Sequence, residues 1–212
     1  AVQSSDVGIS PELIVRGEVP DDYDCIGVGI DLSCGLGEKN DWTVFTLGGI
    51  SKGKIYLIDQ RRCRSMGNIE KIDTLCEMLA DWNILVENED EQFFPTMSTC
   101  IIWPEAVAYQ TYFEGDFKRI AFDDRSLFNL TCSPVKGFKG DKLARLRGVL
   151  GLFEKKRVVW NKYRKWDVLE EELLNFGHAQ HDDAVDSMVL TMGGLLRRGA
   201  LQLDYNSDSF EM

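Results

Sequence analysis

The chain has 212 residues, of which 44% are hydrophobic and 28% charged, an ordinary composition for a globular protein that buries one core. Its longest apolar runs are too short to span a membrane, and its first residues do not resemble a signal peptide. Six scattered cysteines without a CxxC pair indicate free thiols and exclude a disulfide framework or a cysteine zinc site.

The first half of the chain predicts a meander of strands followed by a helix. We expect residues 1–24 to form an N-terminal linker, because they contain Pro11 and Pro20 and show no sustained periodicity. Apolar runs then predict strands at 25–32, 42–50 and 54–59, joined by a glycine-rich loop and a Ser51-Lys52-Gly53 turn. An amphipathic helix over 67–82 and an acidic loop over 87–91 lead to a fourth strand, 99–103.

The second half alternates helices and strands. We predict helices at 106–117, 139–153, 166–176 and 182–198, with strands near 130–135 and at 157–160. The tail from Gly199 is polar and is expected to be flexible. The chain therefore predicts one α/β domain over 25–198, in which three antiparallel strands precede parallel strands flanked by helices.

Acidic residues occupy the places where a core would least tolerate them. Asp31 ends an apolar strand, and Glu105 directly follows the fourth strand. Asp182, Asp183 and Asp186 open the last helix, where Asp183 and Asp186 are three residues apart and share a face. Helix capping and the helix dipole would need fewer acids than this.

Carboxylates that converge on one sheet edge need a counter-ion, because like charges repel. Hard oxygen ligands select Mg²⁺ or Mn²⁺. Two such ions about 4 Å apart can activate a water and stabilise the leaving oxygen of a phosphodiester. The acids therefore predict a two-metal site that hydrolyses phosphodiesters.

The net charge of −11 hides one basic stretch. Residues 136–165 hold eleven Lys and Arg against Asp141 and Glu154, a net of +9, which leaves −20 on the rest of the chain. A solvated helix face is the simpler reading of such a run. We favour a backbone-phosphate surface. The strand at 157–160 would bring residues 155–157 to the same surface. The residues expected to bind DNA are Lys136, Lys139, Lys142 and Arg145.

Several motifs together resemble the nuclease domain of large terminase subunits from tailed phages and related viruses. They are Gly29-Ile30-Asp31, Asp41-Trp42-Thr43, the strand leading to Glu105, residues 139–145 and residues 181–186. The resemblance covers most of 25–198 and implies a ribonuclease-H-like mixed sheet. It implies that Asp31, Glu105 and Asp183 are catalytic metal ligands, with Asp186 and Asp182 as further ligands. Related RuvC-type resolvases favour Asp183 and Asp186 over Asp182.

The same resemblance implies an activity and partners. The chain would be an endonuclease that uses Mg²⁺ or Mn²⁺ to cut concatemeric viral double-stranded DNA in the cytoplasm of an infected host. Its partners would be a packaging ATPase domain, the portal and the small terminase subunit. The chain itself contains no GxxxxGK[ST] motif, so the ATPase half is expected to be separate.

Other functions remain open at this point. A ribonuclease H or RuvC-type nuclease of another pathway would use the same acids, and a nuclease-like module could bind DNA or a portal without cutting. A proofreading exonuclease would need an acid where Ser33 stands. A sugar-kinase-type ATPase would share the opening Gly29-Ile30-Asp31 run but needs a longer, two-lobed chain.

Overall fold

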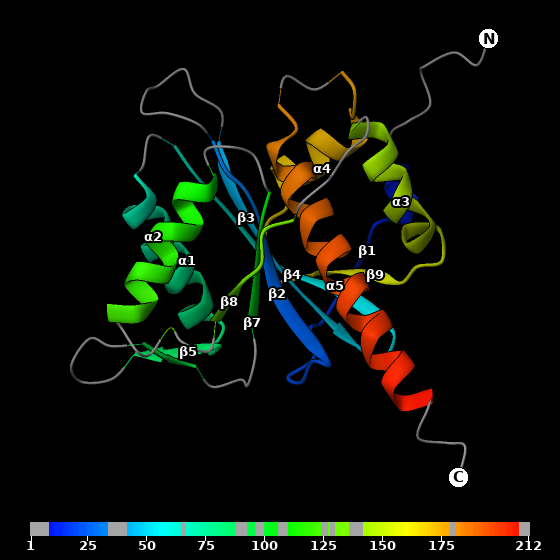
Figure 1. Ribbon diagram of the computed structural model, residues 1–212. Helices are drawn as coiled ribbons and strands as arrows, with labels where there is room; N and C mark the ends of the chain where they lie inside the picture. Colours follow the sequence, from blue (N-terminus) through cyan, green and yellow to red (C-terminus); the bar gives the residue numbers. More distant parts are fainter. Residues whose placement is uncertain are drawn as a thin grey trace.

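A computed structural model describes residues 9–33, 42–64, 67–87, 93–95, 100–105, 110–123, 127, 130–135, 142–178 and 181–207. Its centre is a seven-stranded sheet in the order β1-β9-β4-β3-β2-β7-β8 (Figure 1). The strands are β1 (Val15–Gly17), β2 (Cys25–Asp31), β3 (Thr43–Ser51), β4 (Lys54–Cys63), β7 (Cys100–Pro104), β8 (Leu130–Cys132) and β9 (Val158–Asn161).

Strand direction decides which residues meet at each edge of this sheet. Strand β3 is antiparallel to both of its neighbours, β2 and β4, whereas the β2–β7, β7–β8, β4–β9 and β1–β9 pairs are parallel. The carboxyl ends of all strands except β3 therefore lie at one edge. The predicted mixed sheet, antiparallel in its first strands and parallel afterwards, is confirmed.

Helices cover both faces of the sheet (Figure 1). Helices α1 (Asn68–Asp81) and α2 (Gln110–Asp123) pack on one face, against a core that includes Val28 and Phe45. Helices α3 (Lys142–Glu154), α4 (Asp167–Leu174) and α5 (Asp183–Ser207) cover the other face, where the core includes Leu57 and Trp160. The sheet is thus buried on both sides, which explains the continuous apolar runs of its strands.

Three segments differ from the sequence expectation. The supposed linker 1–24 contains a short 3-10 helix, Pro11–Leu13, and the edge strand β1, which pairs with β9. Strands β5 (Leu85–Glu87) and β6 (Phe93–Pro95) form a small separate sheet that was not predicted; of the expected acidic loop 87–91, all but Glu87 lies outside the described residues. Helix α5 continues to Ser207, so the predicted flexible tail from Gly199 is helical in its described part. Three-residue strands are too short to show a periodicity, and this explains why β1, β5 and β6 were not predicted.

The thiols agree with the prediction where the structure describes them. The described cysteines, which are Cys25, Cys63, Cys76, Cys100 and Cys132, are free thiols, and Cys34 lies outside the described residues. Burial raises the pKa of the Cys100 thiol to about 12, which keeps it protonated and unreactive. No described helix is long and apolar enough to cross a membrane.

Candidate metal and nucleic-acid site

Asp31 and Glu105 lie side by side at the carboxyl edge of the sheet. Strands β2 and β7 are parallel neighbours, with Ile30 opposite Pro104. The backbone N–H of Glu105 donates to the carbonyl of Ile30 at 3.2 Å, which continues the ladder by one residue. The apolar strands thus deliver two carboxylates to adjacent positions where the strands end, as the sequence predicted.

Helix α5 carries the other acids to the same edge. It packs closely on β2 because Gly29 has no side chain: a Cβ there would lie 2.5 Å from the carbonyl oxygen of Ser187 and the backbone nitrogen of Thr191. The Gly29 N–H donates to Thr191 Oγ1 at 3.0 Å, and Ser187 Oγ donates to the Gly29 carbonyl at 3.0 Å. Because these bonds fix the helix against the strand that ends in Asp31, the first turn of α5 faces the site.

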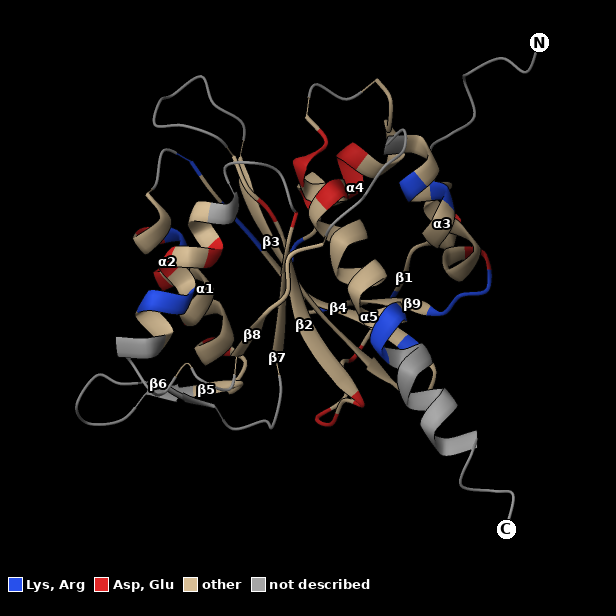
Figure 2. Ribbon diagram, in the orientation of Figure 1, with Lys and Arg blue, Asp and Glu red and all other residues tan. Residues whose placement is uncertain are grey.

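Within that first turn, Asp183 and Asp186 are buried, with exposed fractions of 9% and 7%, and Asp182 is partly exposed. Asp183 Oδ2 accepts a hydrogen bond from the Trp42 backbone N–H at 3.2 Å, and His181 Nδ1 lies 4.0 Å from the same oxygen. The expected helix register, with Asp183 and Asp186 inward and Asp182 nearer solvent, agrees with this burial. Figure 2 shows acidic residues at the end of the sheet where α5 begins.

Arg145 joins two of these acids. From α3, its Nη1 lies 3.3 Å from Glu105 Oε1 and its Nη2 lies 3.6 Å from Asp186 Oδ1. The Arg145 side chain is only 12% exposed. One guanidinium therefore spans a strand-end carboxylate and a helix carboxylate, which demonstrates that β7 and α5 bring their acids together. The sequence predicts that Arg145 binds DNA and does not predict its contacts with these two acids.

Glu172 of α4 supports the first turn of α5 through hydrogen bonds to its backbone. This residue was not identified from the sequence. Its Oε2 accepts hydrogen bonds from the backbone N–H groups of Ala184, at 2.9 Å, and Val185, at 3.2 Å. Burial raises the pKa of Glu172 to about 7; the two backbone bonds lower it, and the charges of Asp183 and Asp182 raise it further. The available signal was an acid on the apolar stripe of Leu169 and Leu173.

The donor atoms fit a divalent cation in kind, because carboxylate oxygens are the ligands that Mg²⁺ and Mn²⁺ prefer. Asp31, Glu105, Asp183 and Asp186 are the residues that could hold it. In the present arrangement, no three His, Cys, Asp or Glu side chains in the described ranges are grouped closely enough to hold one ion. The guanidinium of Arg145 already spans Glu105 and Asp186.

The predicted basic stretch divides between two edges of the sheet. Lys136 and Lys139 lie outside the described residues, and Lys142 opens α3, although its side chain is not described. Helix α3 begins near the acids, since Arg145 in its first turn reaches them. Lys155, Lys156 and Arg157 are exposed before the amino end of β9, at the opposite edge, so the expectation that they share the surface of α3's start is wrong (Figure 2).

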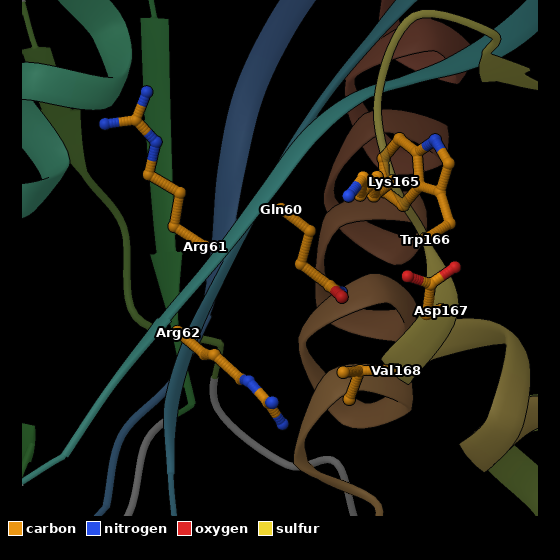
Figure 3. A pocket seen from close by; sticks show the side chains of 7 residues that line it. All are labelled: Gln60, Arg61, Arg62, Lys165, Trp166, Asp167 and Val168. Carbon is orange, nitrogen blue, oxygen red and sulfur yellow. The ribbon is translucent and has the colours of Figure 1, made fainter.

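A second group of cations lies at the same edge as the acids. Strand β4 ends there, and the guanidinium carbons of Arg62 and Arg64 stack on Trp42 at 4.3 and 4.1 Å from the ring centroid. A cavity of about 130 Å³ is lined by Gln60, Arg61, Arg62, Lys165, Trp166, Asp167 and Val168. In Figure 3, Gln60 points toward α5 and Arg61 points away from the other lining side chains. Gln60 Nε2 donates to the carbonyl of Ala184 at 3.1 Å, which places this cavity beside the first turn of α5.

Comparison by sequence identifies no relative, since no family model matches the chain and no curated protein matches it. Comparison by structure does. The human cytomegalovirus terminase nuclease domain is similar with a TM-score of 0.61 at 11% identity, over 87% of this chain and 93% of that one. The large terminase nuclease of thermophilic phage G20c with bound magnesium gives 0.56 at 15% identity, over 85% and 92%.

The large terminase of the thermophilic bacteriophage D6E is a longer relative in structure. Its TM-score is 0.55 at 15% identity, and the match covers 90% of this chain. The chain spans 44% of the length of that large terminase. The resemblance stated from the sequence motifs is thus confirmed at the level of structure: this chain has the ribonuclease-H-like fold of the nuclease domains of large terminase subunits.

Proposed function

We propose that this chain is a divalent-metal-dependent endonuclease that cuts concatemeric viral double-stranded DNA during genome packaging. One observation carries the proposal: acids from β7 and α5 meet so closely that a single guanidinium contacts both Glu105 and Asp186, beside Asp31. The fold similarity to terminase nuclease domains, including one with bound magnesium, supports this reading.

The proposed ligands are Asp31, Glu105, Asp183 and Asp186, with Asp182 as an outer ligand. The first three are the proposed catalytic residues. When bound there, Mg²⁺ or Mn²⁺ would supply the Lewis acidity that phosphodiester hydrolysis needs, with two ions as the proposed complement.

The chain's own residues position these ligands. The Trp42 N–H donates a hydrogen bond to one oxygen of Asp183 and so orients that carboxylate. Glu172 fixes the backbone immediately after Asp183 through Ala184 and Val185. Trp42 directly precedes β3, and Glu172 lies in α4. The geometry of the acids therefore depends on contacts with residues that are distant in the sequence.

For DNA, the proposed contacts lie on both sides of the acids. On the α3 side they are Lys142 and Arg145, and Lys136 and Lys139, which lie outside the described residues, are proposed as further contacts. On the β4 side, Arg62 and Lys165 are exposed around the cavity beside α5. Cations flanking an acidic centre can hold the phosphates on either side of the bond that is cut, which compensates locally for the net charge of −11.

The proposed partners are the packaging ATPase domain, the portal and the small terminase subunit. More than half of the D6E large terminase lies outside the match. This additional length is consistent with a nuclease that works alongside a motor domain. The proposed place of action is the cytoplasm of the infected host cell.

A substrate panel tests the proposed reaction against its rivals. Purified protein with Mn²⁺ would be given supercoiled plasmid, linear duplex, an RNA–DNA hybrid and a four-way junction in parallel. The proposal predicts nicking and linearisation of plasmid and internal cutting of the duplex. Cleavage of the hybrid alone would indicate a ribonuclease H, and of the junction alone a RuvC-type resolvase. Binding without any cleavage would indicate a non-cutting module.

A further inference from the structure

Arg145 lies beside carboxylates that are the proposed metal ligands. It lies in the first turn of α3, and its neighbours Leu146 and Val149 are buried in the core beneath α5. That packing anchors the backbone, so the side chain reaches the acids from a fixed base. With only 12% of the Arg145 side chain exposed, the guanidinium is largely withdrawn from the solvent.

The two contacts of the guanidinium are made with carboxylates on different elements. Nη1 faces Glu105 Oε1 at 3.3 Å, and Nη2 faces Asp186 Oδ1 at 3.6 Å. A planar, rigid fork of N–H donors can bridge two carboxylates in this way, whereas a lysine would offer a single point charge on a flexible stem. The arginine thus holds β7 and α5 together across the site while neutralising part of its charge.

A divalent cation that uses this carboxylate pair would compete with the guanidinium. Ligand oxygens lie about 2.0–2.2 Å from Mg²⁺ or Mn²⁺, so an ion between Glu105 and Asp186 would draw them closer than the guanidinium allows. The two cations would also repel each other at short range. That no three of the described acids are grouped for an ion in the present arrangement is consistent with this competition.

We propose that Arg145 is a resident counter-cation of the acidic site, and that its guanidinium must leave Glu105 and Asp186 before this pair can hold a divalent ion. The proposal rests on the proposed metal-dependent function and adds a determinant of metal affinity. It makes two linked claims: Arg145 stabilises the metal-free protein, and it weakens divalent-ion binding.

The test measures metal binding and unfolding without DNA, on wild type, Arg145→Met and Arg147→Met. Methionine keeps an unbranched side chain without charge. Arg147 is exposed on the same helix, so its substitution removes an equal charge away from the acids. Mn²⁺ binding would be followed by calorimetry and by electron paramagnetic resonance of the free ion, and melting temperature would be recorded in EDTA and in Mn²⁺.

The proposal predicts that Arg145→Met tightens Mn²⁺ binding about tenfold or more, lowers the melting temperature in EDTA and enlarges the rise on adding Mn²⁺. Arg147→Met should resemble wild type in all three. Equal affinity in wild type and Arg145→Met would overturn the inference and leave the proposed function intact. Binding to neither protein would instead contradict the proposed function.

A second measurement covers the case in which Arg145→Met does not fold. In wild-type protein, the ¹⁵Nε–H resonance of Arg145, assigned from its loss in Arg145→Lys, should shift as Mg²⁺ is added. The shift should saturate with the ion that occupies the Glu105–Asp186 pair. An Arg145 resonance that stays unchanged while Mg²⁺ binds would show that the guanidinium does not move, and would contradict the proposal.

Discussion

The carboxylate of Glu172 accepts a hydrogen bond from the backbone N–H of Ala184 at 2.9 Å, so α4 caps the helix that carries the acids of the site. Because burial raises the pKa of Glu172 from 4.5 to about 7, folding favours its protonated form. The stability that this group contributes is therefore complete below about pH 4.5 and is lost as pH rises through about 7.

Glu172→Gln should remove this pH dependence. The amide oxygen can still accept from Ala184 and Val185 but carries no charge at any pH. In EDTA, the free energy of unfolding of the variant relative to wild type should rise between pH 5 and pH 8, by about 3 kcal/mol at most. Glu171→Gln, an exposed change on the same helix, is the control. A constant difference between Glu172→Gln and wild type across this range would refute the assignment.

Asp182 and Asp183 should differ in their effect on cleavage, since Asp183 is buried against the Trp42 N–H and Asp182 is partly exposed. Asp183→Asn should abolish measurable cleavage, because it removes a charged ligand. Asp182→Asn should keep at least about a tenth of the rate, as expected for an outer position. Cleavage rates in Mn²⁺ measure this difference. A larger loss of rate in Asp182→Asn than in Asp183→Asn would contradict the choice of Asp183 as the inner ligand.

The cations beside the β4 end should contribute to DNA affinity. Arg62→Ala with Lys165→Ala should lower the slope of log affinity against log salt concentration by roughly two, because two phosphate contacts are lost. The matched control is Lys155→Ala with Lys156→Ala, which removes the same charge at the opposite edge of the sheet. Equal effects of the two double variants would mean that only net charge matters. Fluorescence anisotropy with a labelled duplex measures both.

The close approach at Gly29 should be needed for the site to assemble. Gly29→Ala places a methyl group 2.5 Å from backbone atoms of α5, so the helix must shift, at a cost of about 2 kcal/mol or more. Denaturant unfolding should show this loss, and Mn²⁺ binding should weaken because Asp183 and Asp186 move with the helix. Gly148→Ala, with open space around its Cβ in α3, should instead stabilise by about 0.5–1 kcal/mol.

Much of the fold could be predicted from the sequence because its strands are buried on both faces. Continuous apolar runs such as that of β2 are strong signals, and the acids after β2 and β7 stand out against them. Edge strand β1 could not be found, because its three residues gain their structure from pairing with β9. Its position was expected to be a linker.

The positions of the acids in the candidate site could be predicted from the sequence, and the residues that support them could not. Asp31, Glu105 and Asp183 follow from strand ends and a helix start, which local patterns reveal. The partners of Arg145 and Glu172 depend on how α3 and α4 pack against α5, a tertiary relationship that helical spacing does not specify. The same limit explains why residues 155–157 were assigned to the wrong edge: the charge of a segment is local, whereas the direction of β9 is set by the sheet.

The acids of the candidate site are proposed to cut DNA with the help of a divalent cation. The most direct measurement is the rate at which supercoiled plasmid is nicked by wild type and by Asp183→Asn, each with Mn²⁺ and with EDTA. We expect cleavage by wild type in Mn²⁺ and none in the other three reactions, with both proteins shown to be folded by circular dichroism. Undiminished cleavage in EDTA, or by Asp183→Asn in Mn²⁺, would contradict this proposal.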